Sequence, residues 1–187
     1  MKFFIGIVPP LATKERIVEF QKSFPSNNVP RMYEPHITLK APSGLSEDKT
    51  WLAPLMTLIG NHAPFLVKLE GLGHFEDRVL FLNPAFSEGL MDLHQKLVAL
   101  LNPDEEAKKK YFEGALYEPR LTLGETTWGG MTKEELEIMR KKADTEFYTV
   151  SPFLVTSVRL YQKEGNGDIY QKLFDIPLKY EPITYHL

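Results

Sequence analysis

Two short stretches of the sequence carry side chains suited to proton transfer and anion binding. Residues 33–40 read Tyr-Glu-Pro-His-Ile-Thr-Leu-Lys, and residues 117–124 read Tyr-Glu-Pro-Arg-Leu-Thr-Leu-Gly. Five of the eight positions are identical, and the two stretches begin 84 residues apart, close to half the chain. Because internal repetition reflects architecture, we predict two related halves that each present one copy of the same strand.

The alternation of side chains along a strand places the polar residues of each stretch on one face. Pro35 and Pro119 cannot donate a hydrogen bond to a neighbouring strand, so each suits the first position of its strand. The polar face is predicted to carry His36, Thr38, Lys40, Arg120 and Thr122. The opposite, aliphatic face is predicted to carry Ile37, Leu39, Leu121 and Leu123.

The repeated stretch resembles the signature of the 2H phosphoesterase superfamily, which includes the RNA 2′,3′-cyclic phosphodiesterases, also called 2′-5′ RNA ligase-like proteins. Members of that family carry two His-x-Thr/Ser-x motifs, one in each lobe. The first motif is intact over residues 36–39, whereas the second has Arg120 in place of the family's histidine and retains Thr122. The resemblance implies an α+β fold of two pseudo-symmetric lobes, with antiparallel sheets lining a central cleft and helices outside.

The resemblance also implies a metal-independent phosphoesterase acting on 2′,3′-cyclic or 2′-5′-linked phosphodiesters of RNA ends or nucleotides. In such a reaction one imidazole takes a proton from water and another gives one to the departing ribose oxygen, tasks that suit a pKa of about 6.5. Arg120 cannot exchange a proton usefully, but it can hold a phosphate through two parallel hydrogen bonds. We therefore predict that His36, Thr38 and Thr122 are catalytic and that Arg120 binds phosphate together with both threonines.

Two other functions stay open at this point. A non-catalytic nucleotide or RNA-end binding protein derived from such an enzyme is the main alternative, because Arg120 preserves recognition while it removes one proton carrier. A third possibility is phosphodiester chemistry on a small metabolite. If the site is of this family, the two polar faces should confront each other across a cleft, close enough for one phosphate to contact both His36 and Arg120.

Three further residues are candidates for the same site. His74 lies in a glycine-rich bend and could supply the missing second imidazole, although a histidine in a surface turn is the simpler interpretation. Phe75 and Tyr161 are aromatic side chains that could stack on a base.

Each of the main residues also has a structural interpretation. Arg120 could form an ion pair with Glu118 or Glu125 instead of contacting a phosphate. Tyr33 and Tyr117, which open the two stretches, are expected to pack beside the cleft and not to touch a substrate.

Composition and charge exclude several kinds of protein and site. The 187 residues carry a formal net charge of −3, so a polyanion site must come from a local basic cluster. The sequence has no cysteine, which excludes a disulfide framework and a thiol nucleophile. No apolar run approaches the length of a membrane span, and the apolar N-terminus is interpreted as a buried strand. We expect a cytoplasmic monomer without cofactor or metal, whose partner is an RNA end or nucleotide phosphodiester and not a membrane.

Hydrophobic periodicity and turn residues predict the elements that must position these residues. The predicted strands cover residues 3–8, 36–41, 65–69, 79–82, 116–125, 153–161 and 170–178. The predicted helices cover residues 13–24, 46–59, 90–100 and 132–143, with Thr13, Ser46 and Thr132 as caps. Two antiparallel hairpins are predicted, one joining 65–69 to 79–82 and one joining 153–161 to 170–178 through a turn at 164–168. Residues 25–32 are predicted to be a loop, 104–110 a solvated segment and 181–187 a tail, and the whole chain, 1–187, a single bilobal domain.

Overall fold

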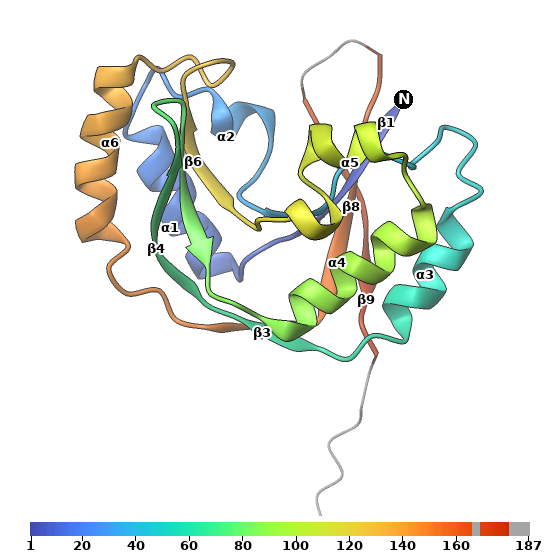
Figure 1. The fold of residues 1–187 in the computed structure, drawn as a ribbon. Coiled ribbons are helices and arrows are strands. Elements are labelled where there is room, and N and C mark those ends of the chain that lie inside the picture. Colours follow the sequence, from blue (N-terminus) through green and yellow to red (C-terminus); the bar gives the residue numbers. More distant parts are fainter. Residues whose placement is uncertain (166–168, 180–187) are drawn as a thin grey trace, which may run out of the picture.

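The computed structural model describes residues 1–165 and 169–179 (Figure 1). A seven-stranded antiparallel sheet has the order β4-β5-β6-β2-β1-β8-β9, and a separate antiparallel pair joins β3 to β7. The strands are β1 (Lys2–Ile7), β2 (Ile37–Lys40), β3 (Phe65–Val67), β4 (Leu69–Phe75), β5 (Val79–Pro84), β6 (Leu121–Glu125), β7 (Phe153–Val155), β8 (Ser157–Lys163) and β9 (Gln171–Pro177). The helices are α1 (Leu11–Lys22), α2 (Val29–Met32), α3 (Leu52–Gly60), α4 (Glu88–Leu101), α5 (Glu105–Tyr111) and α6 (Lys133–Glu146), with a 3₁₀ helix η1 (Gly114–Leu116). This architecture confirms the predicted α+β class.

The two sequence repeats form the central strands of the sheet. β2 and β6 pair through Ile37 and Leu121, which are themselves 84 positions apart, so a pseudo-two-fold axis passes between them. The strand order repeats on either side, because β1 and then β8 follow β2 just as β5 and then β4 follow β6. The structure therefore contains two related halves that meet at the repeated stretch.

A bulge interrupts each central strand at the same place. The partners of Thr38 and Lys40 in β1 are adjacent residues, so Leu39 has no partner of its own there. The register shifts at the equivalent point between β5 and β6. Because a bulge disturbs the alternation of side chains, Lys40 leaves the polar face to which the sequence assigned it and is fully buried.

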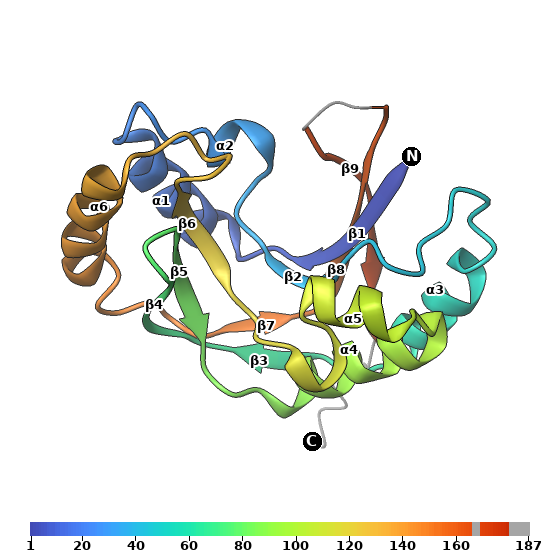
Figure 2. The same cartoon turned by 45° about the horizontal axis from the view of Figure 1, so that its top comes forward.

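Helices and the aliphatic face of the sheet form the core. α1 packs against β6, and α6 packs against β4, β5 and β6, whereas α4 packs against β2 and α3 against β9. Figure 2 shows these two helix pairs at opposite ends of the molecule. The aliphatic residues of the central strands are completely buried, as predicted: Ile37, Leu39, Leu121 and Leu123.

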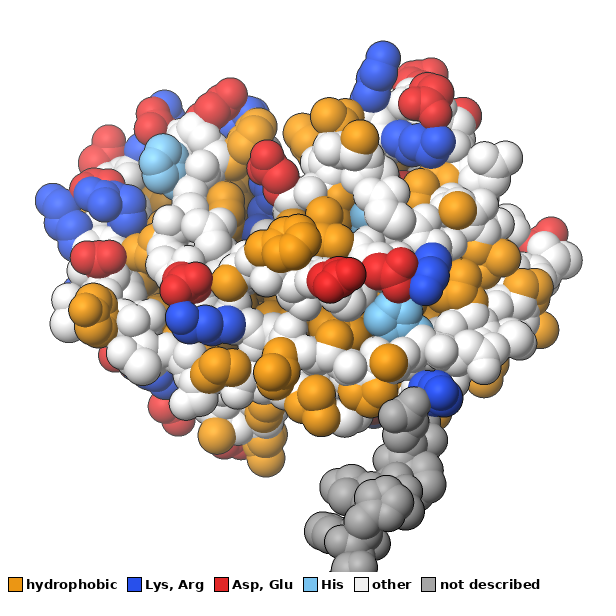
Figure 3. Space-filling view, turned by 60° about the horizontal axis from the view of Figure 1, so that its bottom comes forward, with side chains coloured by type: hydrophobic (Ala, Val, Ile, Leu, Met, Phe, Trp, Pro, Cys, Tyr) orange, Lys and Arg blue, Asp and Glu red, His pale blue; other side chains and the backbone are white. Residues whose placement is uncertain are grey.

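The predicted hairpin between residues 65–69 and 79–82 is wrong in its first strand. β3 pairs with β7 in the small sheet, and the strand that pairs with β5 is β4, whose register shifts at a bulge between Leu69 and Leu72. The apolar run in residues 65–69 hid the boundary between two strands, because β3 and β4 are separated by one residue. Leu66 and Leu154 lie opposite each other in the small sheet and are exposed. Figure 3 views the molecule from this side, where hydrophobic and charged side chains are interspersed.

Two helix starts differ from the predictions. α1 begins at Leu11, directly after Pro10, and Thr13 does not cap it, because the chain turns into the helix as soon as the two prolines end β1. α3 begins at Leu52 and not at Ser46, whose hydroxyl donates to the Asp48 carboxylate in a local turn. The Thr132 capping box of α6 is confirmed, with both reciprocal hydrogen bonds present.

Other segments contain more helix or shorter strands than predicted. The loop at 25–32 ends in the single turn α2, and the segment at 104–110 forms α5, capped by Asp104, whose carboxylate accepts from the Ala107 amide. The second motif strand starts only at Leu121, after η1, and the strand at 153–161 divides into β7 and β8. β8 and β9 form the second predicted hairpin. Its turn lies partly, and the predicted tail wholly, outside the described residues.

Candidate active site

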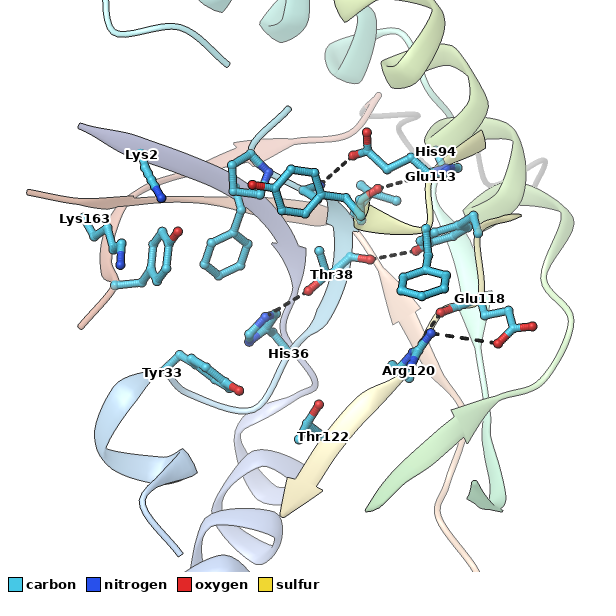
Figure 4. Close-up of a pocket in the computed structure, with 18 of the residues that line it drawn as sticks. Lys2, Tyr33, His36, Thr38, His94, Glu113, Glu118, Arg120, Thr122 and Lys163 are labelled. Atoms are coloured by element: carbon cyan, nitrogen blue, oxygen red, sulfur yellow. Dashed lines mark hydrogen bonds and ion pairs between the residues drawn. The ribbon is translucent and has the colours of Figure 1, made fainter. Parts of the chain in front are cut away.

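A cavity of about 490 Å³ lies over the polar face of the two central strands (Figure 4). Both motif strands contribute to its lining, through His36 and Thr38 on one side and Arg120 and Thr122 on the other. The structure thus brings the four main sequence-predicted residues together around one space. Figure 4 shows His36, Thr38 and Arg120 facing that space, with Thr122 next to them on β6.

Hydrogen bonds determine which nitrogen of His36 carries the proton. Nδ1 lies 2.8 Å from the carbonyl oxygen of Glu34, which can only accept, so Nδ1 is the protonated nitrogen of the neutral ring. Nε2 is then the acceptor, and the Thr38 hydroxyl lies 3.2 Å from it. Burial lowers the pKa of His36 below its usual value of 6.5. The imidazole is therefore neutral at pH 7 and presents an unprotonated nitrogen to the cavity.

Aromatic rings and a glycine fix the position of this imidazole. The ring centroids of Phe4, Tyr33 and Tyr161 lie 4.8, 5.1 and 5.6 Å from that of His36. Gly6 in β1 provides the space, because a Cβ at that position would lie 3.1 Å from Cδ2 of His36. The side chain is thus held on several sides, which suits a group that must exchange a proton in a fixed direction.

The side chain of Glu34 lies in a charged network behind His36. Its carboxylate accepts from Arg159 at 2.6 Å, from the Tyr161 hydroxyl at 2.8 Å and from Lys14 at 3.1 Å. These contacts hold the pKa of the Glu34 carboxyl below its usual value against the opposing effect of burial. They also immobilise the residue whose carbonyl orients the imidazole.

Arg120 repeats the hydrogen bond of His36 in the second half of the molecule. Its Nε donates to the carbonyl oxygen of Glu118 at 3.4 Å, and Glu118 is the repeat partner of Glu34. The guanidinium carbon lies 5.2, 5.7 and 5.8 Å from the ring centroids of Phe81, Phe112 and Phe75. The ion pair with Glu118 that the sequence suggested is long, 3.9 Å, and Glu118 is exposed, so this carboxylate leaves most of the guanidinium donors available.

The tyrosines that open the two stretches both line the cavity. The Tyr117 hydroxyl donates to the carbonyl oxygen of Thr38 at 2.8 Å, which ties the second repeat to the first motif strand. His94, which sequence reasoning did not connect to the site, stacks on Tyr117 with 3.6 Å between ring centroids. Its Nδ1 donates to the Leu39 carbonyl at 2.8 Å, and its Nε2 accepts from the Gly114 amide at 2.9 Å. His94 therefore lines the cavity but has no free nitrogen for catalysis.

A buried ion pair closes the site beside η1. Lys40 donates to Glu113 at 2.6 Å, and both side chains are almost completely buried. The same ammonium donates to the carbonyl oxygens of Ala41 and Ser43, so each of its three N–H donors has an acceptor. Glu113 lines the cavity, and the pair fixes the segment after α5 against the first motif strand. The sequence carried no signal for this pair, because its members are 73 residues apart.

The three additional sequence candidates lie outside the cavity lining. His74 is exposed on β4 beside a separate hollow, with Nδ1 3.3 Å from the Glu76 carbonyl, so it does not replace a second imidazole. Phe75 packs near Arg120 and does not line the cavity. Tyr161 is only 1% exposed, stacked under Phe4 at 4.4 Å, so its ring has no free face for a base.

Two exposed aromatic residues at the cavity were not identified from the sequence. Trp128, 54% exposed, follows β6 and stands at 6.2 Å from the ring of Tyr33. Phe112, 45% exposed, follows α5. Both line the cavity. The sequence did not indicate this position, because each residue lies in an irregular segment without a hydrophobic period.

Within residues 1–165 and 169–179, no helix is long and apolar enough to cross a membrane. The same residues contain no cluster of three or more His, Asp or Glu side chains placed to hold a metal ion.

Comparisons with known proteins relate the chain to one family. Residues 9–167 match the family model of the 2′-5′ RNA ligase superfamily. The structure is similar to TT0787 of Thermus thermophilus, with 22% identity, a TM-score of 0.66 and coverage of 97% of this chain and 100% of that one. E. coli LigT complexed with 3′-AMP gives 18% identity, a TM-score of 0.61 and coverage of 96% and 98%. LigT complexed with phosphate gives 19%, 0.60, and again 96% and 98%. A search among curated proteins found no sequence match. The structural likeness confirms the LigT-like fold.

Proposed function

We propose that this chain, which belongs to the 2′-5′ RNA ligase superfamily, is a metal-independent phosphoesterase acting on 2′,3′-cyclic or 2′-5′-linked phosphodiesters of RNA ends or nucleotides. One observation carries the proposal. A neutral imidazole with an unprotonated Nε2 shares a cavity with a guanidinium group, and the two residues directly precede the paired central strands β2 and β6. The first can activate water, and the second can hold the phosphate that the water attacks.

Each residue then has a defined task in the proposed reaction. Nε2 of His36 takes the proton of the attacking water, because Nδ1 is already committed to the Glu34 carbonyl. Arg120 binds the non-bridging phosphate oxygens and stabilises the charge that develops on them. The hydroxyls of Thr38 and Thr122 donate to the same oxygens, and Thr38 can turn from His36 toward the phosphate once water occupies its place.

Among the described residues, no imidazole with a free nitrogen remains to protonate the departing ribose oxygen. In the part of the chain that the structure describes, His36 and His94 are the imidazoles that line the cavity, and both nitrogens of His94 are engaged. The leaving oxygen must then take its proton from solvent while Arg120 offsets its charge. A general acid typically contributes about 10²–10⁴-fold to the rate, so we expect slow turnover.

Aromatic side chains offer surfaces for the nucleoside. Trp128 and Phe112 are exposed and line the cavity from different segments. Stacking of a base on an aromatic ring contributes about 1–3 kcal/mol and tolerates any base. Binding of RNA ends without strong base preference follows from this arrangement.

Arg120 also supports a second candidate, a non-catalytic nucleotide or RNA-end binding protein. Three phenylalanine rings surround the guanidinium, and that environment favours a permanent cation over a group that must lose and regain a proton. Such a protein would keep phosphate recognition and have no turnover.

Turnover of a 2′,3′-cyclic mononucleotide distinguishes the two functions. The native protein should release a nucleoside monophosphate, and His36→Ala should lower the rate by about 10²–10⁴-fold. His74→Ala removes an exposed imidazole outside the cavity and should leave the rate unchanged. If the native protein binds 3′-AMP but turns over no cyclic phosphate, the binding function is preferred. Loss of activity in His74→Ala would contradict the assignment of the site.

A further inference from the structure

Two lysines on neighbouring strands lie side by side at one end of the cavity. Lys2 in β1 is the direct cross-strand partner of Lys163 in β8, and both side chains line the cavity. Figure 4 shows them together at the end remote from Arg120. Neither lysine forms an ion pair with any of the residues that the structure describes.

Without a bound anion, the repulsion between the two facing lysines destabilises the folded protein. Like charges directly opposite each other on neighbouring strands destabilise a sheet. The contact that Lys163 makes is with the ring of Tyr170, 5.4 Å from its ammonium nitrogen to the ring centroid, and this does not neutralise the charge of Lys2. An anion bound between the two ammonium groups would relieve the repulsion.

The spacing along β1 relates the lysines to the phosphate site. Lys2, Phe4 and Gly6 lie on one face of the strand, and Gly6 is the residue against which His36 packs. At about 3.3 Å per residue, Lys2 stands roughly 13 Å from Gly6 along the strand. Phe4 lies between them, with the ring of Tyr170 edge-on to it at 4.8 Å. The cavity thus runs from the site at His36 and Arg120, past aromatic rings, to a pair of cations.

We propose that Lys2 and Lys163 form a second anion subsite, which binds the phosphate on the 5′ side of the nucleoside whose 2′,3′-phosphate lies at His36 and Arg120. The inference rests on the proposed function and extends it. In a nucleotide the ribose separates the 3′ and 5′ phosphates and the base projects to one side, so two anion sites can each hold a phosphate while the base contacts the aromatic rings that line the cavity between them. The preferred ligand is then an RNA end or a 5′-phosphorylated nucleotide, because a nucleoside with a 5′-hydroxyl leaves the lysines unpaired.

Calorimetric titration of matched ligands tests the subsite. The native protein should bind adenosine 3′,5′-bisphosphate about tenfold more tightly than 3′-AMP, a difference equal to about 1.4 kcal/mol. The double variant Lys2→Ala/Lys163→Ala should bind the two ligands equally, with its affinity for 3′-AMP unchanged. Lys22→Ala removes an exposed lysine at the end of α1, away from the cavity, and should retain the tenfold preference. A dinucleotide 3′-monophosphate gives the same comparison for a phosphodiester on the 5′ side.

The outcomes separate this subsite from the proposed function. If 3′-AMP binds but the 5′-phosphate adds nothing, or if the double variant keeps the preference, the lysine subsite is wrong and the proposed function stands. If 3′-AMP fails to bind while 5′-AMP binds the native protein and not the double variant, the lysines bind phosphate and the proposed function is wrong. An equal loss in Lys22→Ala would mean that general charge attracts the ligand, which also overturns the subsite.

Discussion

Replacing Arg120 with histidine should restore the proton carrier that the second half of the site lacks. Nδ1 of His36 donates to the carbonyl of Glu34, and Nε of Arg120 donates to the carbonyl of Glu118, which occupies the equivalent position of the repeat. An imidazole at position 120 would find the same acceptor for its Nδ1 and would direct Nε2 into the cavity. Because a pseudo-two-fold axis relates the central strands, we expect the new imidazole to occupy the position equivalent to that of His36.

The expected gain follows from the role of a single general acid. Such a group contributes about 10²–10⁴-fold, which corresponds to roughly 3–5 kcal/mol of barrier at about 1.4 kcal/mol per decade. One structural difference opposes the full gain. Gly6 gives His36 its space in the first half, whereas the residue opposite Thr122 is Phe81, whose ring lies against position 120. We therefore expect Arg120→His to approach the lower end of this range, and affinity for phosphate to fall because the bidentate contact is lost.

Release of nucleoside monophosphate from a 2′,3′-cyclic mononucleotide measures the effect. Arg120→Gln is the matched control, because it also removes the guanidinium but supplies no titrating group. We expect Arg120→His to be faster than both the native protein and Arg120→Gln, with a descending limb appearing in its pH profile. If the native protein is the faster enzyme, Arg120 has a positive catalytic role and the interpretation of a missing acid is refuted.

Three further predictions concern pH and binding. Turnover by the native protein should rise with pH through the depressed pKa of His36 and then stay level toward pH 8, since the acceptor must be neutral and no imidazole acid opposes it; a bell-shaped profile would reveal a second essential group. Glu125→Gln should stabilise the protein at pH 8 by up to about 3 kcal/mol and have little effect near pH 4. The reason is that burial raises the pKa of Glu125 from 4.5 to about 7, so the stability of the protonated form is lost as pH rises between these values; equal denaturant midpoint shifts at both pH values would contradict this. Phosphate or 3′-AMP should raise the melting temperature by mass action, Arg120→Ala should remove most of that protection and Lys110→Ala should not, and equal losses would indicate non-specific charge.

The repeated stretch made the centre of the fold predictable from the sequence. Its proline start and its alternation identified two strands with one aliphatic face, and a match of five residues in eight indicated two related halves. The pairing of Ile37 with Leu121 follows directly from that repeat. Local patterns located the four longest helices for the same reason, because amphipathic spacing is a property of the neighbouring sequence alone.

Long-range pairings were beyond the reach of local patterns. The bulge at Leu39 directs Lys40 into the core, where it pairs with Glu113. No hydrophobic periodicity in either segment indicates that contact. The partner of β3 is β7, far along the chain, whereas an apolar run close by suggested a hairpin. Exposed aromatics such as Trp128 become candidates only once the fold places them at the cavity, because an aromatic residue in a loop has many other possible roles.

The central claim is that one phosphate is held between Nε2 of His36 and the guanidinium of Arg120. Long-range nitrogen–proton NMR of the histidine rings tests it most directly, with 3′-AMP titrated into the native protein and into Arg120→Ala. We expect that His36 of the free protein is protonated on Nδ1 and that 3′-AMP shifts its Nε2 resonance while those of His62 and His74 stay fixed. Arg120→Ala should largely abolish this shift. A proton on Nε2 in the free neutral ring, or an undiminished response in Arg120→Ala, would contradict it.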